Sequence, residues 1–221
     1  MSAHSPRLVL LVEDHPMVRT LVERSLEADG FEVASYATSK QAIKEFHGLD
    51  PDVLVADIDL GERPNGLELA TLLRAQAPYL GVVFLSNYPS LDNVEGPTPA
   101  PPGSSFIHKS MVDGPDVLRS AIETALDDTR DPLIVGLPDD RPLAHLSAPQ
   151  LNMLRYLAEG WSNAEISERR GITQRATERL VSRTFHALGI ADDPTVNPRV
   201  VATRLYIQNF GVPEPGGASS S

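Results

Sequence analysis

The sequence of 221 residues predicts an α/β domain with a doubly wound parallel sheet, followed by a smaller all-α domain. Three observations lead to this prediction. Short apolar runs alternate with segments of helical period over residues 1–127. Charged residues and prolines dominate residues 128–144, which is typical of an interdomain linker. From residue 145 onward only the helical period remains. Each half is long enough to bury a core of its own.

Five short apolar runs are the predicted strands of the first domain, at residues 8–12, 31–35, 53–56, 82–85 and 105–107. They are apolar throughout instead of alternating, which is typical of strands that are covered on both faces. Such cover comes from helices, so the runs predict a parallel sheet between two helical layers.

Four segments with helical period lie between or after these runs, at residues 18–26, 42–46, 67–73 and 117–125. Ser39 and Asp113 stand where N-cap residues are expected. The fourth gap differs, because residues 87–105 contain five prolines. Prolines at that density prevent a regular helix, so we expect a loop there.

Polar residues follow four of the five predicted strands. They are Glu13 and Asp14, Asp57, Ser86 and Lys109. Right-handed crossovers place all strand ends at one edge of the sheet, where these side chains should meet. Singly, an acid after a strand is commonly a turn residue and a lysine is commonly solvated. Together they predict a Mg²⁺ site at which Asp57 accepts a phosphoryl group whose oxygens Ser86 and Lys109 contact.

The net charge of −11 belongs to the first part of the chain. Residues 1–144 carry a net charge of −12, whereas residues 145–221 carry +1. Within residues 169–183 five arginines stand against one acid, a local balance that suits contact with phosphates. The chain contains no cysteine, which excludes disulfides and thiolate metal sites and fits the cytoplasm.

The second domain is predicted to contain four helices. Ser147, Ser162 and Thr173 are the expected N-caps of the first three, and the fourth spans about residues 198–210. A short helix, a turn and a longer helix have the geometry that fits a DNA major groove. In the third helix we expect an inward face of Ala176, Leu180, Val181 and Leu188 and a polar face of Gln174, Arg175, Glu178, Arg179, Ser182 and Arg183. A solvated helix face is the plain alternative for the polar residues.

Four motifs of the first domain resemble the receiver domain of two-component response regulators, over about residues 7–127. They are LVEDHP at 11–16, the aspartate in VLVADIDL at 53–60, the serine in VVFLSN at 82–87 and the lysine in FIHK at 106–109. The resemblance implies a flavodoxin-like fold with Asp57 as the phosphoacceptor. It also implies that Mg²⁺ is held by Glu13, Asp14, Asp57 and the backbone carbonyl of Asp59.

The same resemblance implies three residues of a conformational switch. Ser86 is the hydroxyl that moves toward the acyl phosphate, Phe106 is the aromatic residue that turns inward, and Lys109 is the cation that binds the phosphoryl group. Two departures stand out. Gly61 replaces a proline that is frequent in the family, and the proline-rich residues 87–105 replace its fourth helix, so the usual dimer surface should be altered.

Residues 157–190 resemble the LuxR/FixJ-type helix-turn-helix DNA-binding domain. This implies a recognition helix at about residues 174–188, and Glu165 as the partner that orients an arginine. Glu178 departs from the resemblance, because a basic residue usually stands there. The residues expected to contact DNA are Arg175, Arg179, Arg183, Gln174, Glu178, Thr173, Ser162 and Asn163.

Together the motifs resemble a NarL/FixJ-type response regulator: a receiver at 1–127, a linker at 128–144, a DNA-binding domain at 145–211 and a disordered tail at 212–221. We expect a transcriptional regulator that a sensor histidine kinase phosphorylates in a phosphorelay and that binds double-stranded DNA as a homodimer on an inverted repeat. No enzymatic activity is expected beyond self-phosphorylation and dephosphorylation of the receiver. Two alternatives remain: a partner- or ligand-controlled receiver that needs no phosphorylation, and a Mg²⁺-dependent phosphatase or phosphotransferase.

Overall fold

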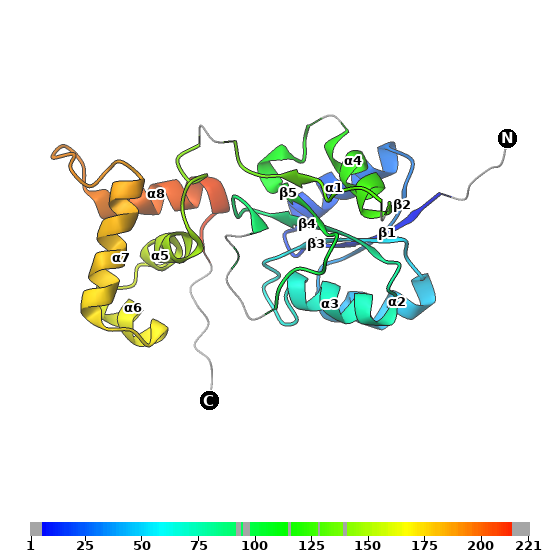
Figure 1. The fold of residues 1–221 in the computed structure, drawn as a ribbon, viewed down its shortest axis with the longest axis horizontal. Coiled ribbons are helices and arrows are strands. Elements are labelled where there is room, and N and C mark those ends of the chain that lie inside the picture. Colours follow the sequence, from blue (N-terminus) through cyan, green and yellow to red (C-terminus); the bar gives the residue numbers. More distant parts are fainter. Residues whose placement is uncertain are drawn as a thin grey trace. The chain divides into compact units, whose positions relative to one another are not determined.

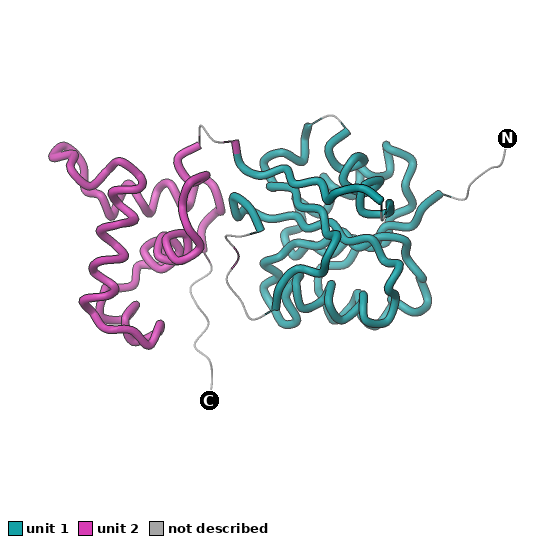
Figure 2. The backbone as a smooth tube through the Cα atoms, in the orientation of Figure 1, with its two compact units in different colours: residues 1–91, 96–137 teal, residues 92–95, 138–221 magenta. Residues whose placement is uncertain are grey.

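The chain forms two compact units, residues 1–91 with 96–137 and residues 92–95 with 138–221 (Figure 2). The computed structural model describes residues 6–91, 94, 98–114, 116–127, 129–138 and 141–213. Residues 214–221 of the tail predicted to be disordered lie outside this part. Among the described residues, no helix has both the length and the apolar character needed to cross a membrane.

The first unit is a parallel sheet of six strands in the order β2-β1-β3-β4-β5-β6, with helices on both faces. Helices α1 and α4 lie together on one face, and α2 and α3 lie on the other (Figure 1). The predicted doubly wound α/β fold is confirmed. The strands are β1 (Leu8–Val12), β2 (Glu32–Tyr36), β3 (Val53–Asp57), β4 (Gly81–Ser86), β5 (Ser105–His108) and β6 (Ile134–Val135), and the helices are α1 (Pro16–Ala28), α2 (Ser39–Leu49), α3 (Gly66–Gln76) and α4 (Val117–Ala125).

The central strands form the core of this unit. Every residue of β3, β4 and β5 is buried, as the continuous apolar runs predict for strands covered on both faces. Residues 87–91, 94 and 98–104, the described part of the proline-rich segment, contain no α-helix, which agrees with the sequence.

Both predicted helix caps of this unit were wrong. Thr38 caps α2, where its Oγ1 accepts from the Gln41 amide at 3.3 Å. Ser39 instead is the first helical residue, and its side chain is buried. The N-cap of α4 is Asp116, in a left-handed conformation without a side-chain cap, three residues beyond the predicted Asp113.

A sixth strand lies inside the segment that the sequence predicted as linker. In β6, Ile134 pairs with Phe106 and Val135 with Ile107 of β5. The Phe106 amide also donates to the carbonyl of Leu133 at 2.8 Å. Part of the predicted linker therefore belongs to the sheet. A strand of two residues is too short to show a periodic pattern of apolar residues in the sequence.

The second unit consists of α5 (Ala148–Ala158), α6 (Asn163–Arg170), α7 (Gln174–Ala187) and α8 (Pro198–Phe210). Helix α5 contacts α7 and α8, and α6 contacts α7. The predicted N-caps Ser147, Ser162 and Thr173 are confirmed. Gly171 ends α6 with a φ of 62°, a left-handed conformation that favours glycine.

The inward face of α7 differs in part from the prediction. Leu180 and Val181 are buried as expected, whereas Ala176 and Leu188 are only partly buried. Two threonines, Thr177 and Thr184, are buried as well. The Thr184 hydroxyl donates to the carbonyl of Leu180 at 2.8 Å, so a polar side chain is accommodated within the helix itself.

Candidate functional site

Three carboxylates meet at the carboxyl edge of the sheet, as predicted. Glu13 and Asp14 follow β1, and Asp57 ends β3, the neighbouring strand. One oxygen from each lies within 4.8 Å of the others. Glu13 and Asp57 are buried, whereas Asp14 is exposed. Parallel pairing of β1 and β3 brings these residues together, because both strands end at the same edge.

Lys109 supplies positive charge to this cluster. Its Nζ lies 2.8 Å from Oδ2 of Asp57 and 2.8 Å from Oε2 of Glu13. Nζ also donates to Oε1 of Glu13 at 3.0 Å. The lysine follows β5, and its sequence separation of 96 residues from Glu13 shows that only the fold creates this contact. The predicted phosphoacceptor, acidic pair and cation thus form one site.

Burial governs the protonation of these groups. It raises the pKa of Glu13 to about 7, with a further rise from the Asp57 carboxylate and an opposing effect of Lys109. Burial likewise raises the pKa of Asp57, and Lys109 partly offsets this rise. Burial alone would lower the pKa of Lys109, but the carboxylates of Asp57 and Glu13 outweigh it, so that pKa is raised. Lys109 stays charged while Glu13 titrates near neutral pH.

We expect the first unit to lose stability as the pH rises from 4.5 to 7 when divalent cations are absent. The folded pKa of Glu13 lies above its unfolded value of 4.5, so the folded state binds the extra proton in this window. The free energy of unfolding should fall by up to about 3 kcal/mol. Urea unfolding at several pH values measures this loss. Glu13→Gln is the control and should remove most of the slope; an unchanged slope in that variant would contradict the assignment.

The site fits a magnesium ion. Its donors are carboxylate oxygens, which Mg²⁺ prefers. Oε2 of Glu13 is buried and accepts no hydrogen bond, although it faces Lys109 as an ion pair. A buried carboxylate oxygen with this free capacity suits a cation. The Asp59 amide donates to Oδ1 of Asp57 at 3.1 Å, while the role of the Asp59 carbonyl stays a prediction.

Two residues that were not among the predicted site residues hold the acidic pair in place. Arg19 donates from Nη1 to the carbonyls of Glu13 at 2.7 Å and of Asp14 at 3.4 Å. The Gly61 amide donates to Oδ2 of Asp14 at 3.0 Å. A proline has no N–H to donate, so the replacement of proline by Gly61 was the available signal for this contact.

The predicted switch residues lie on the two neighbouring strands. Ser86 ends β4 and is fully buried, and its Oγ accepts from the Tyr88 amide at 3.1 Å. Phe106 lies on β5 opposite Phe84, and it is fully buried as well. Their movement on phosphorylation stays a prediction.

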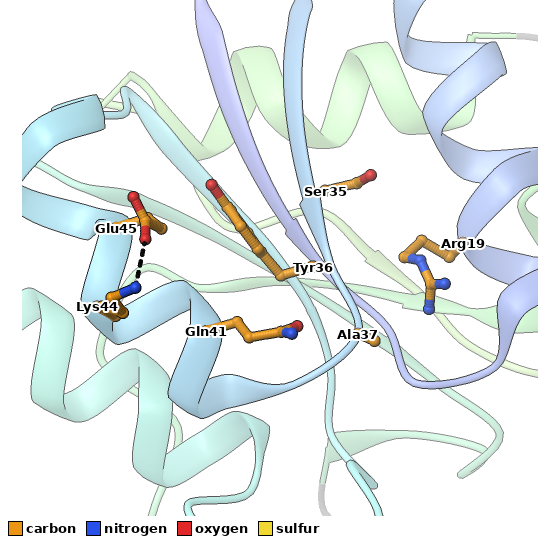
Figure 3. A pocket seen from close by; sticks show the side chains of 7 residues that line it. All are labelled: Arg19, Ser35, Tyr36, Ala37, Gln41, Lys44 and Glu45. Atoms are coloured by element: carbon orange, nitrogen blue, oxygen red, sulfur yellow. Dashed lines mark ion pairs between the residues drawn. The ribbon is translucent and has the colours of Figure 1, made fainter.

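Figure 3 shows an open pocket of about 510 Å³ in the first unit. Arg19, which holds the carbonyls of the acidic pair, reaches into it. None of the predicted site residues lines it, and the sequence did not indicate it. Its lining consists of Arg19, Ser35, Tyr36, Ala37, Gln41, Lys44 and Glu45.

The predicted polar face of α7 is exposed along its whole length. None of Arg175, Arg179 and Arg183 forms an ion pair with an acid in the described part of the chain. Glu178 is partnered, because its Oε1 accepts from Nε2 of Gln174 at 2.9 Å. Three cations therefore face solvent at intervals of four residues, about one helical turn each.

Three residues near the starts of α6 and α7 were predicted to contact DNA, and all have partners in the structure. The Ser162 and Thr173 hydroxyls accept the amides of Glu165 and Ala176, each at 3.2 Å. Oδ1 of Asn163 accepts from Nη1 of Arg199 at 3.1 Å. The predicted contact with DNA would therefore have to use the hydroxyl protons of Ser162 and Thr173 and the amide nitrogen of Asn163 as donors.

Glu165 orients an arginine, as expected. Its Oε1 lies 2.7 Å from Nε of Arg169. The guanidinium carbon of Arg169 lies 3.8 Å from the ring centroid of Trp161, an arrangement typical of a cation–π contact. The two contacts hold the Arg169 guanidinium between Glu165 and Trp161, the residue that precedes the N-cap of α6.

Comparisons with known proteins cover both units. The model for the response regulator receiver domain matches residues 9–128. The nitrate/nitrite response regulator protein NarP of Escherichia coli K12 is 26% identical over 96% of this chain and 99% of its own. The transcriptional regulatory protein TrcR of Mycobacterium tuberculosis H37Rv is 38% identical, over 42% of this chain and 37% of its own.

A solved structure shares the fold along the chain. RcsB of Salmonella enterica serovar Typhimurium, solved bound to promoter rprA with the phosphomimetic BeF3−, has a TM-score of 0.52. The likeness covers 90% of this chain and 98% of that one. At 18% identity it concerns the fold alone.

Proposed function

The chain belongs to the response regulator receiver family, and from this we propose that it is a NarL/FixJ-type transcriptional regulator controlled by phosphorylation of Asp57. One observation carries the proposal: the buried Asp57 carboxylate lies 2.8 Å from Nζ of Lys109, beside the acidic pair. The relative NarP, which matches along nearly the whole chain, is itself a response regulator.

The residues of the site divide the phosphoryl transfer among them. A carboxylate oxygen of Asp57 attacks the phosphorus of a phosphohistidine on a sensor histidine kinase; the phosphorus–nitrogen bond breaks and an acyl phosphate forms. Lys109 neutralises charge on the transferred oxygens, and Glu13 and Asp14 would hold Mg²⁺. When bound, the ion would supply further charge neutralisation. The Gly61 amide and Arg19 keep the acidic pair in position.

Phosphorylation of the purified protein by a small phosphodonor with Mg²⁺ tests this proposal. Intact mass should show a gain of one phosphoryl group in the wild type and none in Asp57→Asn. Asp113→Asn, which removes an exposed carboxylate of the same unit, should behave as the wild type. Absence of any gain in the wild type would refute phosphorylation control.

The exposed face of α7 supports DNA as the partner of the second unit. Arg175, Arg179 and Arg183 are spaced to follow one groove, and a helix after a short helix and turn is the element that enters a major groove. In this proposal residues 145–211 are the DNA-binding domain, and a homodimer binds an inverted repeat. The cytoplasm is the proposed location, because the partner is DNA.

Arg179→Ala should weaken DNA binding and lower its salt dependence. Loss of one phosphate contact reduces the slope of log affinity against log salt concentration by about 1. Fluorescence anisotropy with a labelled duplex over a salt series measures the slope. The control Arg24→Ala removes an exposed arginine of α1 and should leave the slope unchanged. Equal slopes for Arg179→Ala and the wild type would exclude Arg179 from the interface.

A second candidate function keeps DNA binding but replaces phosphorylation by a partner or ligand of the receiver. The absence of an α-helix in the described part of residues 87–104 favours it, because this part of the signalling face is altered. DNA binding without phosphoryl uptake would support it. The phosphatase or phosphotransferase alternative receives no support from relatives such as NarP.

A further inference from the structure

The turn after β4 is held at three successive residues. The Tyr88 amide donates to Oγ of Ser86 at 3.1 Å. Nε2 of His108 lies 3.2 Å from the carbonyl of Asn87, and the Leu137 amide donates to the carbonyl of Pro89 at 3.1 Å. The turn that carries the switch hydroxyl is thus tied to β5 and to the chain that leaves the first unit.

The tautomer of His108 follows from its neighbours. The Ser110 amide donates to Nδ1 of His108 at 3.2 Å, so Nδ1 is an acceptor. The proton then resides on Nε2, which donates it to the carbonyl of Asn87. His108 therefore fixes one side of the turn.

Residues 133–137 fix the other side. Leu133 accepts from the Phe106 amide at 2.8 Å, and its own amide donates to Oγ of Ser105 at 3.1 Å. A Cβ added to Gly136 would lie 2.6 Å from the carbonyl oxygen of Pro89, too close for any side chain. The segment contacts both the strand of Phe106 and the turn of Ser86, and glycine permits the second contact.

We propose that residues 133–137 are a positioning segment for Ser86, and that phosphorylation of Asp57 loosens this segment. The inference rests on the proposed function. Ser86 is fully buried and engaged with Tyr88. The proposed switch role of Ser86 has its hydroxyl move toward a phosphoryl group on Asp57, and the hydrogen bond from the Leu137 amide to the Pro89 carbonyl restrains the turn that follows Ser86.

The coupling works in both directions, because linkage is reciprocal. If phosphorylation weakens the hold of Leu137 on Pro89, then weakening that hold by substitution must favour the phosphorylated form. Residue 137 is also the last residue of the first unit, and Pro138 begins the second. Loosening residues 133–137 lengthens the free chain between the two units by five residues. The phosphorylation site thereby acts on the tether of the DNA-binding domain through residues 133–137.

The experiment combines beryllofluoride, a phosphoryl mimic, with hydrogen–deuterium exchange of the full-length protein. Fluorine NMR reports binding of the mimic in the presence of Mg²⁺, and exchange reports protection of a peptide spanning residues 131–138. In the wild type this peptide should be protected without the mimic and should exchange faster once the mimic is bound.

Gly136→Ala places a methyl group against the Pro89 carbonyl and should release the segment without any mimic. It should also bind beryllofluoride about fivefold more tightly, because this ratio of affinities corresponds to the net free energy of one hydrogen bond. Leu137→Pro removes the amide donor together with the leucine side chain. It should act in the same direction, which keeps the test decisive if one variant fails to fold. Gly48→Ala is the matched control, because a Cβ at Gly48 meets nothing within 4 Å; it should behave as the wild type.

The outcomes separate this inference from the proposed function. If the mimic binds and the peptide exchanges equally with and without it, the positioning role is refuted while phosphorylation control stands. Unchanged affinity for the mimic in both variants would refute the coupling as well. If the wild type shows no bound mimic, the proposed function fails, and this inference fails with it.

Discussion

Gly66→Ala should destabilise the first unit by about 3 kcal/mol and should greatly reduce phosphoryl uptake. A Cβ on Gly66 would stand 2.0 Å from the carbonyl oxygen of Asp57, 2.8 Å from its carbon and 2.9 Å from Cα of Ile58. All three are backbone atoms, so no side-chain rotation relieves the contact. Either α3 or the end of β3 must move, and the second movement displaces the phosphoacceptor itself.

Urea unfolding followed by far-UV circular dichroism measures the first effect, and intact mass after phosphodonor treatment measures the second. Gly48→Ala is the control within α2, where alanine suits a helix interior better than glycine by about 0.5–1 kcal/mol. It should be neutral or slightly stabilising. A Gly66→Ala variant as stable as the wild type would show that α3 does not approach β3 this closely.

Lys109→Met should cost about 3 kcal/mol of stability at pH 8 and clearly less at pH 5. The lysine lies between Glu13 and Asp57, with Nζ 2.8 Å from an oxygen of each. Its removal leaves two buried carboxylates without a counter-ion. The cost shrinks at low pH because Glu13, with its pKa raised by burial to about 7, then takes up a proton.

A double variant separates the electrostatic contribution from packing. Glu13→Gln combined with Lys109→Met carries one buried charge fewer, so it should recover part of the loss at pH 8. Comparing the free energies of unfolding of the single and double variants in urea gives the interaction free energy between Glu13 and Lys109. If Lys109→Met loses stability equally at both pH values, lost packing of the lysine side chain explains the effect instead.

Much of the fold followed from the sequence because the strands are buried on both faces. All five predicted strands are present with shifts of at most one residue at either end. Residues Glu13, Asp14, Asp57 and Lys109 meet as predicted, since parallel strands end at one edge. The helices of the second unit could also be predicted from the sequence, because Ser162 and Thr173 cap α6 and α7 through local contacts.

The features that the sequence did not reveal depend on contacts between distant segments. Strand β6 exists only by pairing with β5, about 28 residues away in sequence. The Gly61 amide reaches Asp14 from the loop after β3, 47 residues away in sequence. Thr177 and Thr184 are buried despite their hydroxyls, because tertiary packing overrides residue type. The periodicity of the sequence does not encode such contacts.

Trp161 is the only tryptophan of the chain, and its indole ring lies under the guanidinium of Arg169. Its intrinsic fluorescence therefore reports on the second unit alone, with an emission sensitive to the cation above the ring. A urea titration that records tryptophan emission alongside circular dichroism distinguishes the melting of the helical unit from that of the sheet. The wild-type chain thus carries its own optical probe of whether phosphorylation in one unit alters the stability of the other.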